Sequence, residues 1–276
     1  MQKLFIKNRK GQNMSVIVEG EEKRGPLAPQ SRSASAGLAF VMHGLGSSKE
    51  SVFVRAQTEV FLKNGFTTVR FDTTHAFGES EGDYADATST GYYEDLEDII
   101  SWARTQSWYR EPFWLSGSSL GGLCIALYAE KYPKKIKALA LMAPVVSGRL
   151  RVEAYQKYEP EIFKKWQDTG WRSEESGSTH GLIKKLKYSY VKDLLDYDLL
   201  PVANKLTMPV FLVVGQYDTS IPPEQQQVLF DALPGPKEMY IIKGAPHSFR
   251  EPAHLAEIKD LFDRWIKKCQ QSVIPA

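Results

Sequence analysis

Cysteine and long apolar runs are both scarce in this 276-residue chain, and their scarcity limits where the protein can work. Cys124 and Cys269 are its two cysteines, and we expect both to be free thiols in a reducing compartment. No apolar run approaches the roughly 18 residues that a membrane-spanning helix needs. The N-terminus, residues 1–7, also lacks the apolar stretch of a signal peptide. The sequence therefore predicts a cytoplasmic protein without a membrane span.

Net charge and cofactor motifs are also sparse. The formal net charge is +2, so we expect no bulk attraction to nucleic acid or to an acidic membrane. No cluster of histidines and carboxylates has the spacing of metal ligands, and no glycine-rich phosphate loop precedes a helix. We therefore expect no metal, no nucleotide or other cofactor, and no nucleic-acid partner.

What the chain does contain is the pattern of a single α/β domain. Apolar residues make up 42% and charged residues 25%, which is ordinary for a globular protein with a large core. A hairpin is expected at residues 3–18, followed by an exposed loop at residues 20–36. From residue 37 short apolar strands alternate with helices, which predicts a parallel sheet covered by helices on both faces. The expected strands lie near 38–43, 67–72, 113–117, 137–143, 209–215 and 239–243, and the expected helices near 50–64, 92–107, 119–132, 223–232 and 252–269.

The most informative segment is Gly117-Ser118-Ser119-Leu120-Gly121, which fits the pattern G-x-S-x-G. A strand-like run precedes it and a helix-like run follows it, which is the context that this motif needs. The sharp turn forces Ser119 into a strained backbone conformation, and the two glycines avoid a collision across the turn. A serine held in this way presents its hydroxyl to a substrate, so Ser119 is the expected nucleophile.

A serine nucleophile needs a base and an acid that orients the base, in the chain order serine, acid, histidine. Asp218 follows the strand-like run 210–215, and His247 follows the run 239–244. We expect His247 to be the general base and Asp218 the orienting acid, with Glu224 a distant rival for the acid.

The oxyanion that forms in such a reaction needs two hydrogen-bond donors. The loop His43-Gly44-Leu45-Gly46 follows an earlier strand, and its glycines permit close approach of the backbone. The expected donors are the backbone N–H groups of Leu45 and Leu120. Asp72, at the end of a buried strand, is expected to be a structural hydrogen-bonding group instead of a catalytic acid.

These motifs, in this order, resemble those of the α/β-hydrolase superfamily over most of the chain. They are HGLG at 43–46, GSSLGG at 117–122, GQYD at 215–218 and GAPH at 244–247. A fifth segment, residues 70–82, resembles a stretch of the cinnamoyl/feruloyl esterase and monoacylglycerol lipase branch. The resemblance implies the α/β-hydrolase fold with a mostly parallel eight-stranded sheet, and a His43 that bonds to backbone beneath the oxyanion loop.

Two departures from that branch lie at the expected walls of the active site. Ser118 stands where the branch usually has a histidine. Ala76-Phe77-Gly78 stands in place of the branch's Gly-His-Gly, with His75 displaced. Neither departure touches the expected triad, so both bear on the substrate more than on the reaction.

The strand–helix alternation breaks at residues 147–203, which are rich in lysine and aromatic residues and are expected to be helical. The superfamily commonly carries a cap over the active site here, so the expected division is a core of 1–146 and 204–276 and a cap of 147–203. Trp166 and Trp171 are candidates for contact with substrate, although for any single aromatic of a small insert the favoured interpretation is a place in the insert's own core or surface. Its lysines are interpreted as solvated, with a docking patch for an acidic substrate as the alternative; they include Lys164, Lys165, Lys184 and Lys185.

Together these features predict a serine carboxylesterase that acts on small-molecule esters through the triad and an acyl-enzyme intermediate. The same triad serves thioesterases, serine peptidases or amidases and C–C hydrolases, and those activities remain alternatives. A ligand-binding receptor on the same scaffold is a further alternative, which the complete triad disfavours. The sequence leaves open the acyl and alcohol groups and the oligomeric state, including a homodimer.

Overall fold

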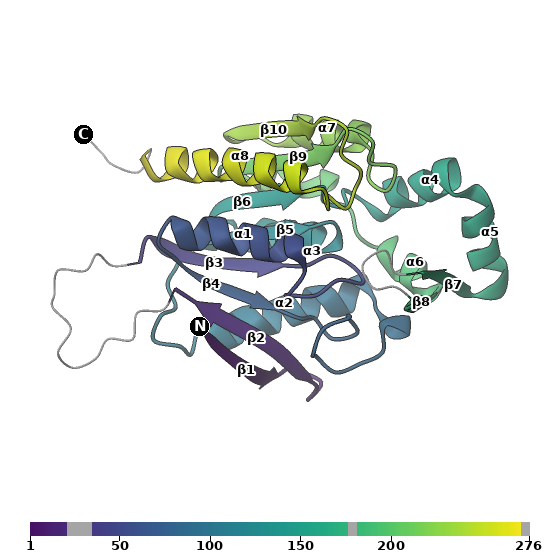
Figure 1. Cartoon of the computed structure of the whole chain (residues 1–276), viewed down its shortest axis with the longest axis horizontal. Coiled ribbons are helices and arrows are strands. Elements are labelled where there is room, and N and C mark those ends of the chain that lie inside the picture. The colour runs from purple at the N-terminus through teal and green to yellow at the C-terminus, as the bar shows by residue number, and fades with distance from the viewer. Residues whose placement is uncertain (21–34, 176–180, 272–276) are drawn as a thin grey trace, which may run out of the picture.

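The computed structural model describes residues 1–20, 35–175 and 181–271, and an eight-stranded sheet runs through them (Figure 1). The strand order is β1-β2-β4-β3-β5-β6-β9-β10. β2 is antiparallel to β1 and to β4, and all the other neighbouring pairs are parallel, which confirms the mostly parallel sheet expected from the sequence. Most of the loop predicted at 20–36 lies outside the described residues. The strands are β1 (Gln2–Lys7), β2 (Asn13–Glu19), β3 (Gly37–Met42), β4 (Phe66–Phe71), β5 (Phe113–Ser118), β6 (Ile136–Met142), β9 (Val210–Gly215) and β10 (Lys237–Ile242).

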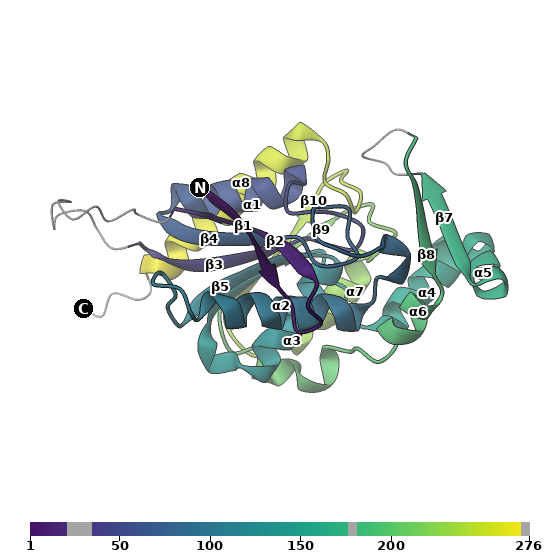
Figure 2. The same ribbon diagram turned by 90° about the horizontal axis from the view of Figure 1, so that it is seen from below.

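Helices cover both faces of the sheet, as Figure 2 shows. α1 (Val52–Lys63) and α8 (Pro252–Gln271) lie on one face, and α2 (Ser89–Ala103) and α3 (Leu120–Lys131) lie on the other. α7 (Pro223–Ala232) adds Leu229 to the core on the α2 and α3 side. Side-chain caps fix where two of these helices begin, because Ser51 Oγ accepts from Val54 N and Thr88 Oγ1 accepts from Gly91 N.

The central strands are apolar on both sides because each face of the sheet packs against a helical layer. Phe113 and Leu115 of β5 belong to the core on the α2 and α3 side, whereas Trp114 between them packs against α1 and α8. The rings of Phe61 and Trp265 lie 6.1 Å and 5.4 Å from that of Trp114. Burial on both faces explains why these strands appear in the sequence as short continuous apolar runs.

Between β6 and β9 the chain leaves the sheet and forms a group of elements at the right of Figure 1, here called the insert (residues 147–203). It contains α4 (Gly148–Tyr158), α5 (Pro160–Thr169), α6 (Ser189–Leu194) and an antiparallel hairpin of β7 (Trp171–Glu175) and β8 (Ile183–Lys187). The insert is thus helical only in part. Leu186 is the one buried side chain in the two hairpin strands, so the apolar alternation that marks a strand in a sequence is missing. The division of the chain into core and cap stays a prediction.

The insert has its own aromatic core, and Trp166 is at its centre. Its side chain is fully buried, and the rings of Tyr155, Tyr188 and Tyr190 lie within 6.3 Å of it. The indole Nε1–H donates to the Leu186 carbonyl oxygen at 3.1 Å, which ties α5 to β8. Trp166 therefore stabilises the insert by burying apolar area while its polar atom keeps a partner.

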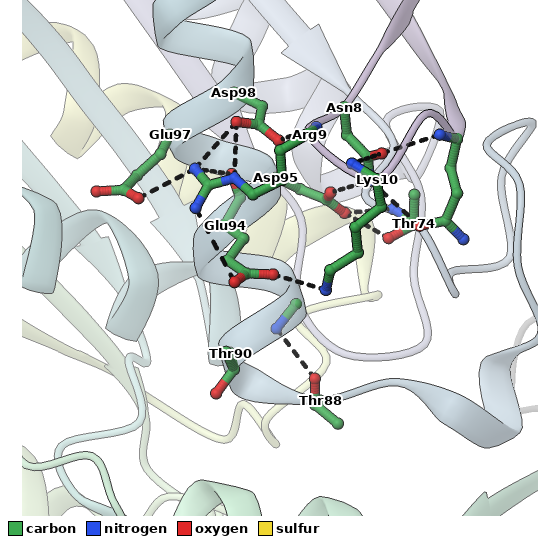
Figure 3. A network of polar contacts seen from close by, with 12 residues as sticks. Asn8, Arg9, Lys10, Thr74, Thr88, Thr90, Glu94, Asp95, Glu97 and Asp98 are labelled. Atoms are coloured by element: carbon green, nitrogen blue, oxygen red, sulfur yellow. Dashed lines mark hydrogen bonds and ion pairs between the residues drawn. The ribbon is translucent and has the colours of Figure 1, made fainter.

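A polar network fastens the N-terminal hairpin to α2 (Figure 3). Asn8 Nδ2 donates to Asp95 Oδ1 at 3.0 Å, and Thr74 donates to Asp95 Oδ2 through its N–H at 2.6 Å and its hydroxyl at 2.7 Å. On the exposed rim, Arg9 forms ion pairs with Asp98 and Glu97. Asp95 thus joins three segments that are distant in sequence, namely the β1–β2 turn, the loop after β4 and α2.

α3 carries a buried acid near its C-terminal end. Glu130 is 4% exposed, and its Oε1 has no hydrogen-bond partner among the described residues. Burial raises the pKa of this carboxyl from 4.5 to about 8, and the nearby Lys205 opposes that rise. Because the folded-state pKa lies above the unfolded one, the folded protein retains a proton that the unfolded chain loses. The contribution of Glu130 to stability is therefore greatest below pH 4.5 and is lost as the pH rises through about 8.

Substitution of Glu130 by glutamine should flatten this dependence on pH. The free energy of unfolding of Glu130→Gln, relative to that of the wild type, should rise by ~2 kcal/mol or more between about pH 5 and about pH 8.5, because glutamine does not ionise. Urea unfolding at several pH values measures the difference. Glu161→Gln, which removes an exposed carboxyl on α5, is the control. Parallel pH curves for Glu130→Gln and the wild type would contradict the assignment.

Candidate active site

Ser119 lies in a sharp turn between β5, which ends at Ser118, and α3, which begins at Leu120. Its backbone has φ 52° and ψ −119°, a conformation that is costly for a residue other than glycine. A Cβ atom at Gly121 would lie 2.3 Å from the His43 carbonyl oxygen, and one at Gly117 would lie 2.7 Å from the Gly121 carbonyl oxygen. Glycine at both positions is what lets the turn close, and the strained elbow expected from the sequence is present.

Asp218, His247 and Ser119 lie on three different loops, and the structure brings the three side chains together. Asp218 follows β9 and His247 follows β10, and the carboxyl ends of these parallel strands lie at the same edge of the sheet as that of β5. His247 Nε2 is 3.1 Å from Ser119 Oγ, and His247 Nδ1 is 2.6 Å from Asp218 Oδ2. A continuous hydrogen-bonded chain therefore runs from the carboxylate through the imidazole to the serine hydroxyl.

The surroundings of Asp218 fix how the imidazole is protonated. The carboxylate is buried, and its Oδ1 accepts from the N–H groups of Ser220 and Ile221 at 2.9 Å and 2.8 Å. A carboxylate only accepts, so the proton of neutral His247 is on Nδ1 and Nε2 is free to accept from Ser119. Glu224, the rival acid, is exposed in the first turn of α7 and is not the hydrogen-bond partner of His247.

The loop after β3 packs directly against the serine turn. A Cβ atom at Gly44 would lie 3.0 Å from both the Ser118 carbonyl oxygen and Ser119 Cβ, so glycine permits this approach. Leu120 is the first residue of α3, and the N–H of a first helical residue has no partner within its helix. Among the described residues, the N–H groups of Leu120 and Leu45 donate to no backbone acceptor. Both groups are thus available as donors next to Ser119.

A buried polar layer supports that loop from behind. His43 donates through Nδ1 to the Gly44 carbonyl oxygen at 2.8 Å and accepts at Nε2 from Thr73 N at 3.1 Å, as expected for a histidine beneath the loop. Burial lowers the pKa of His43, which keeps it neutral. Next to it, Asp72 accepts from the N–H and the ammonium of Lys49 at 2.7 Å and 2.6 Å. Asp72 therefore has the structural role expected from the sequence.

A cavity of about 690 Å³ opens beside Ser119 and His247. The apolar part of its wall consists of Leu45, Val52, Phe53, Phe77, Met142, Leu182 and Phe249. Phe53 and Phe249 stack at 5.2 Å, which fastens the loop that carries His247 to α1. Ser118 and Phe77, the two departures from the esterase branch, both line the cavity, in agreement with their predicted place in its wall.

The two tryptophans expected to contact substrate do not line this cavity. Trp166 is buried in the core of the insert. Trp171, at the start of β7, is 43% exposed, with the Lys187 ammonium 5.7 Å from its ring. The insert instead contributes Leu182 and Lys184, from the other arm of the hairpin. Leu182 carried no signal in the sequence, because the hairpin lacks apolar alternation, and Lys184 was a candidate only through the alternative of a docking patch for an acidic substrate.

The described residues contain no group of three or more histidines, cysteines, aspartates or glutamates that could hold a metal ion. Both cysteines are free thiols, with Cys124 buried on α3. In the same residues no helix is long and apolar enough to cross a membrane. The cytoplasmic location stays a prediction.

Similarity to known proteins agrees with this geometry. Residues 33–180, more than half of the chain, match the family model Hydrolase_4, described as serine aminopeptidase, S33. A protein of Escherichia coli, described as an uncharacterized 31.7 kDa protein in the traX-finO intergenic region, is 25% identical over 84% of this chain and 90% of its own length. The mouse mitochondrial palmitoyl-protein thioesterase ABHD10 is 26% identical over 84% of this chain and 77% of its own length.

Solved structures show the same fold. Est1E from Butyrivibrio proteoclasticus, solved with ferulic acid bound, has a TM-score of 0.74 and 20% identity, covering 96% of this chain and 98% of that one. Mouse ABHD10 also has a TM-score of 0.74, with 21% identity over 97% of this chain and 99% of that one. The chain thus has the α/β-hydrolase fold, belongs to the Hydrolase_4 family and is a serine hydrolase.

Proposed function

We propose that this chain is a serine carboxylesterase that hydrolyses small-molecule esters. The observation that carries the proposal is the hydrogen-bonded chain Asp218–His247–Ser119, which ends at a hydroxyl in the cavity wall. An esterase needs no further chemical group, because an activated serine and two oxyanion donors suffice for acyl transfer.

In the acylation step, Ser119 Oγ attacks the ester carbonyl carbon while His247 Nε2 takes the hydroxyl proton. The buried Asp218 carboxylate stabilises the imidazolium that forms, without itself taking a proton. The carbonyl oxygen becomes an oxyanion and accepts from the N–H groups of Leu45 and Leu120. Each such donor contributes roughly 3 kcal/mol to the stabilisation of the transition state.

The tetrahedral intermediate then breaks at the bond to the leaving oxygen. His247 gives its proton to that oxygen, the alcohol departs, and an acyl ester remains on Ser119. Water enters, gives a proton to His247 and attacks the acyl carbon. Release of the acid returns the proton from His247 to Ser119 Oγ, so the enzyme is regenerated.

The similar proteins support an acyl substrate, while they leave the bond type to experiment. Est1E was solved with ferulic acid, ABHD10 is described as a thioesterase, and the family description names an aminopeptidase. The cavity wall of this chain combines the aromatic rings of Phe53, Phe77 and Phe249 with aliphatic side chains. Such a wall suits an apolar or aromatic acyl group, and thioester cleavage by the same steps is the second candidate.

Replacement of Ser119 by alanine should abolish turnover with little change in folding. For p-nitrophenyl acetate, butyrate and octanoate and for methyl ferulate, kcat should fall by at least about a thousandfold, because no other group forms the acyl ester. Initial-rate kinetics on wild type and Ser119→Ala measure this, with fluorophosphonate labelling of Ser119 as a second readout. Circular dichroism serves as the folding control.

The same panel includes S-butyryl-N-acetylcysteamine and an aminoacyl anilide to separate the bond types. Faster Ser119-dependent turnover of the thioester than of its oxygen ester would replace the esterase proposal by a thioesterase. Substantial ester hydrolysis by Ser119→Ala would show that Ser119 is not the nucleophile.

Asp218→Asn should reduce kcat by about a thousandfold to ten-thousandfold with a smaller change in KM. An asparagine amide donates to Nδ1 of His247, and this places the imidazole proton on Nε2. A protonated Nε2 can no longer accept the hydrogen bond from Ser119. Glu224→Gln is the matched control, since it removes the exposed rival acid and should leave kcat unchanged. An equal loss in the two variants would contradict the role assigned to Asp218.

A further inference from the structure

A cation from the insert lies inside the cavity. Lys184 on β8 lines the cavity together with Ser119 and His247, and its ammonium donates to the Gly46 carbonyl oxygen at 3.0 Å. The same ammonium is 5.2 Å from the ring centre of Phe77. Lys184 is half-buried and held in place, unlike Lys164, Lys165 and Lys185 of the same insert, which are exposed. The sequence-based interpretation of Lys184 as a solvated lysine is therefore wrong.

The acidic residues near this ammonium are already paired elsewhere. Glu174 lies opposite Lys184 in the hairpin register, but its Oε2 is 2.7 Å from Nη2 of Arg172. Glu50 lines the same cavity, and its Oε2 is 2.9 Å from Nη1 of Arg70. Within the part of the chain that the structure describes, no carboxylate lies within ion-pair distance of the Lys184 ammonium.

A second cation lines the cavity close to Lys184. Arg250, three residues after His247, is near enough for its charge to act on that of Lys184. Burial lowers the pKa of Lys184, Glu174 opposes this, and Arg250 adds to it. A half-buried ammonium is stabilised by an anion, and one hydrogen bond to a carbonyl oxygen uses one of its three donors.

We propose that the cavity selects acyl substrates that carry an anionic group, a carboxylate or a phosphate, and that the Lys184 ammonium binds this group. The inference rests on the esterase function proposed above and adds a substrate class to it. Charge-assisted hydrogen bonds to the two remaining donors of Lys184 hold the anion, and the positive charge of Arg250 adds to the attraction. The apolar walls hold the uncharged remainder of the substrate.

Matched pairs of substrates test the proposal and locate the charge. Mono-p-nitrophenyl adipate against p-nitrophenyl hexanoate places a carboxylate on the acyl side. para-Carboxyphenyl butyrate against para-acetylphenyl butyrate places one on the leaving group. Butyryl-coenzyme A against S-butyryl-N-acetylcysteamine places phosphates on the leaving group. The readout is the ratio of kcat/KM for the anionic member to that for the neutral member of each pair.

Lys184→Met keeps the length of the side chain and removes its charge. It should lower this ratio by about tenfold or more in at least one pair, as expected for loss of a hydrogen bond between charged groups. Lys184→Arg should retain most of the ratio because it retains the charge. Lys185→Met, next to it on the exposed side of the hairpin, should leave both the ratio and the activity unchanged.

The ratio separates charge recognition from a purely structural role. Loss of the hydrogen bond to Gly46 would affect both members of a pair alike, so a Lys184→Met variant with unchanged ratios in all three pairs would overturn the proposal. If Lys184→Met does not fold, the wild type decides the matter. Its ratio should fall from low to high salt as screening weakens the attraction, and a ratio insensitive to salt would overturn the proposal.

Failure of this inference differs from failure of the esterase proposal. Without any Ser119-dependent turnover of neutral or anionic esters, the esterase function itself would be wrong. With Ser119-dependent turnover and ratios that Lys184 does not influence, the esterase function stands and the substrate class is wrong.

Discussion

The strained backbone of Ser119 is the constraint on which the rest of the site depends. A positive φ at a residue with a side chain costs of order 1–3 kcal/mol and persists only where the surroundings hold it. Here Ser119 N donates to the Met142 carbonyl oxygen at 3.0 Å, and the Ser119 carbonyl oxygen accepts from Val145 N at 3.1 Å. Both partners belong to the end of β6 and the loop after it, so the neighbouring strand holds the turn from one side. On the other side the His43 carbonyl oxygen lies where any side chain at residue 121 would have to be. β5, β6 and the loop after β3 thus form one rigid frame around the hydroxyl.

The second support of the site is a group of buried charges behind the loop after β3. Lys49 and Asp72 are 1% and 0% exposed at their side chains, and Glu79 contacts the same ammonium at 2.6 Å. Burying such charges is costly unless every partner is present, because a single charge left alone loses its hydration without compensation. The Asp72 carboxylate also accepts from Glu79 N at 2.8 Å, and a Cβ atom at Gly78 would lie only 2.0 Å from its Cγ. The loops after β3 and β4 therefore have one mutual arrangement, which fixes the positions of Leu45 and Phe77 in the cavity wall.

Much of this could be read from the sequence, and the reason is physical. The ends of parallel strands meet at one edge of a sheet, so Asp218 and His247, placed after two apolar runs, had to lie near Ser119 once the strands were recognised. The glycines at 44, 117 and 121 carried the same information, since each is required by a close approach of backbone. The insert was different, because its hairpin is polar and exposed and no periodicity marks it. Trp166 and Trp171 were pocket candidates only because the insert is rich in aromatic residues. In the structure Trp166 is buried inside the insert and Trp171 is exposed on β7, so neither lines the cavity. Lys184 was indistinguishable from its solvated neighbours, because its position depends on how the hairpin folds back over the loop.

The groups proposed for the reaction and those proposed for substrate selection therefore have separate origins in the chain. Ser119, Asp218 and His247 lie on loops that the sheet fixes, and a change in any of those strands would disturb all three. Leu182 and Lys184 belong to a hairpin that pairs with no strand of the main sheet, so its side chains can vary without moving the hydrogen-bonded chain. The two parts still meet at one contact, where Lys184 donates to the carbonyl oxygen of Gly46, next to Leu45. An anion bound at that ammonium would therefore lie near the loop that carries Leu45, the proposed oxyanion donor. Because like charges repel, the anionic group of a good substrate should bind through the donors of Lys184 that do not point to the Gly46 carbonyl oxygen.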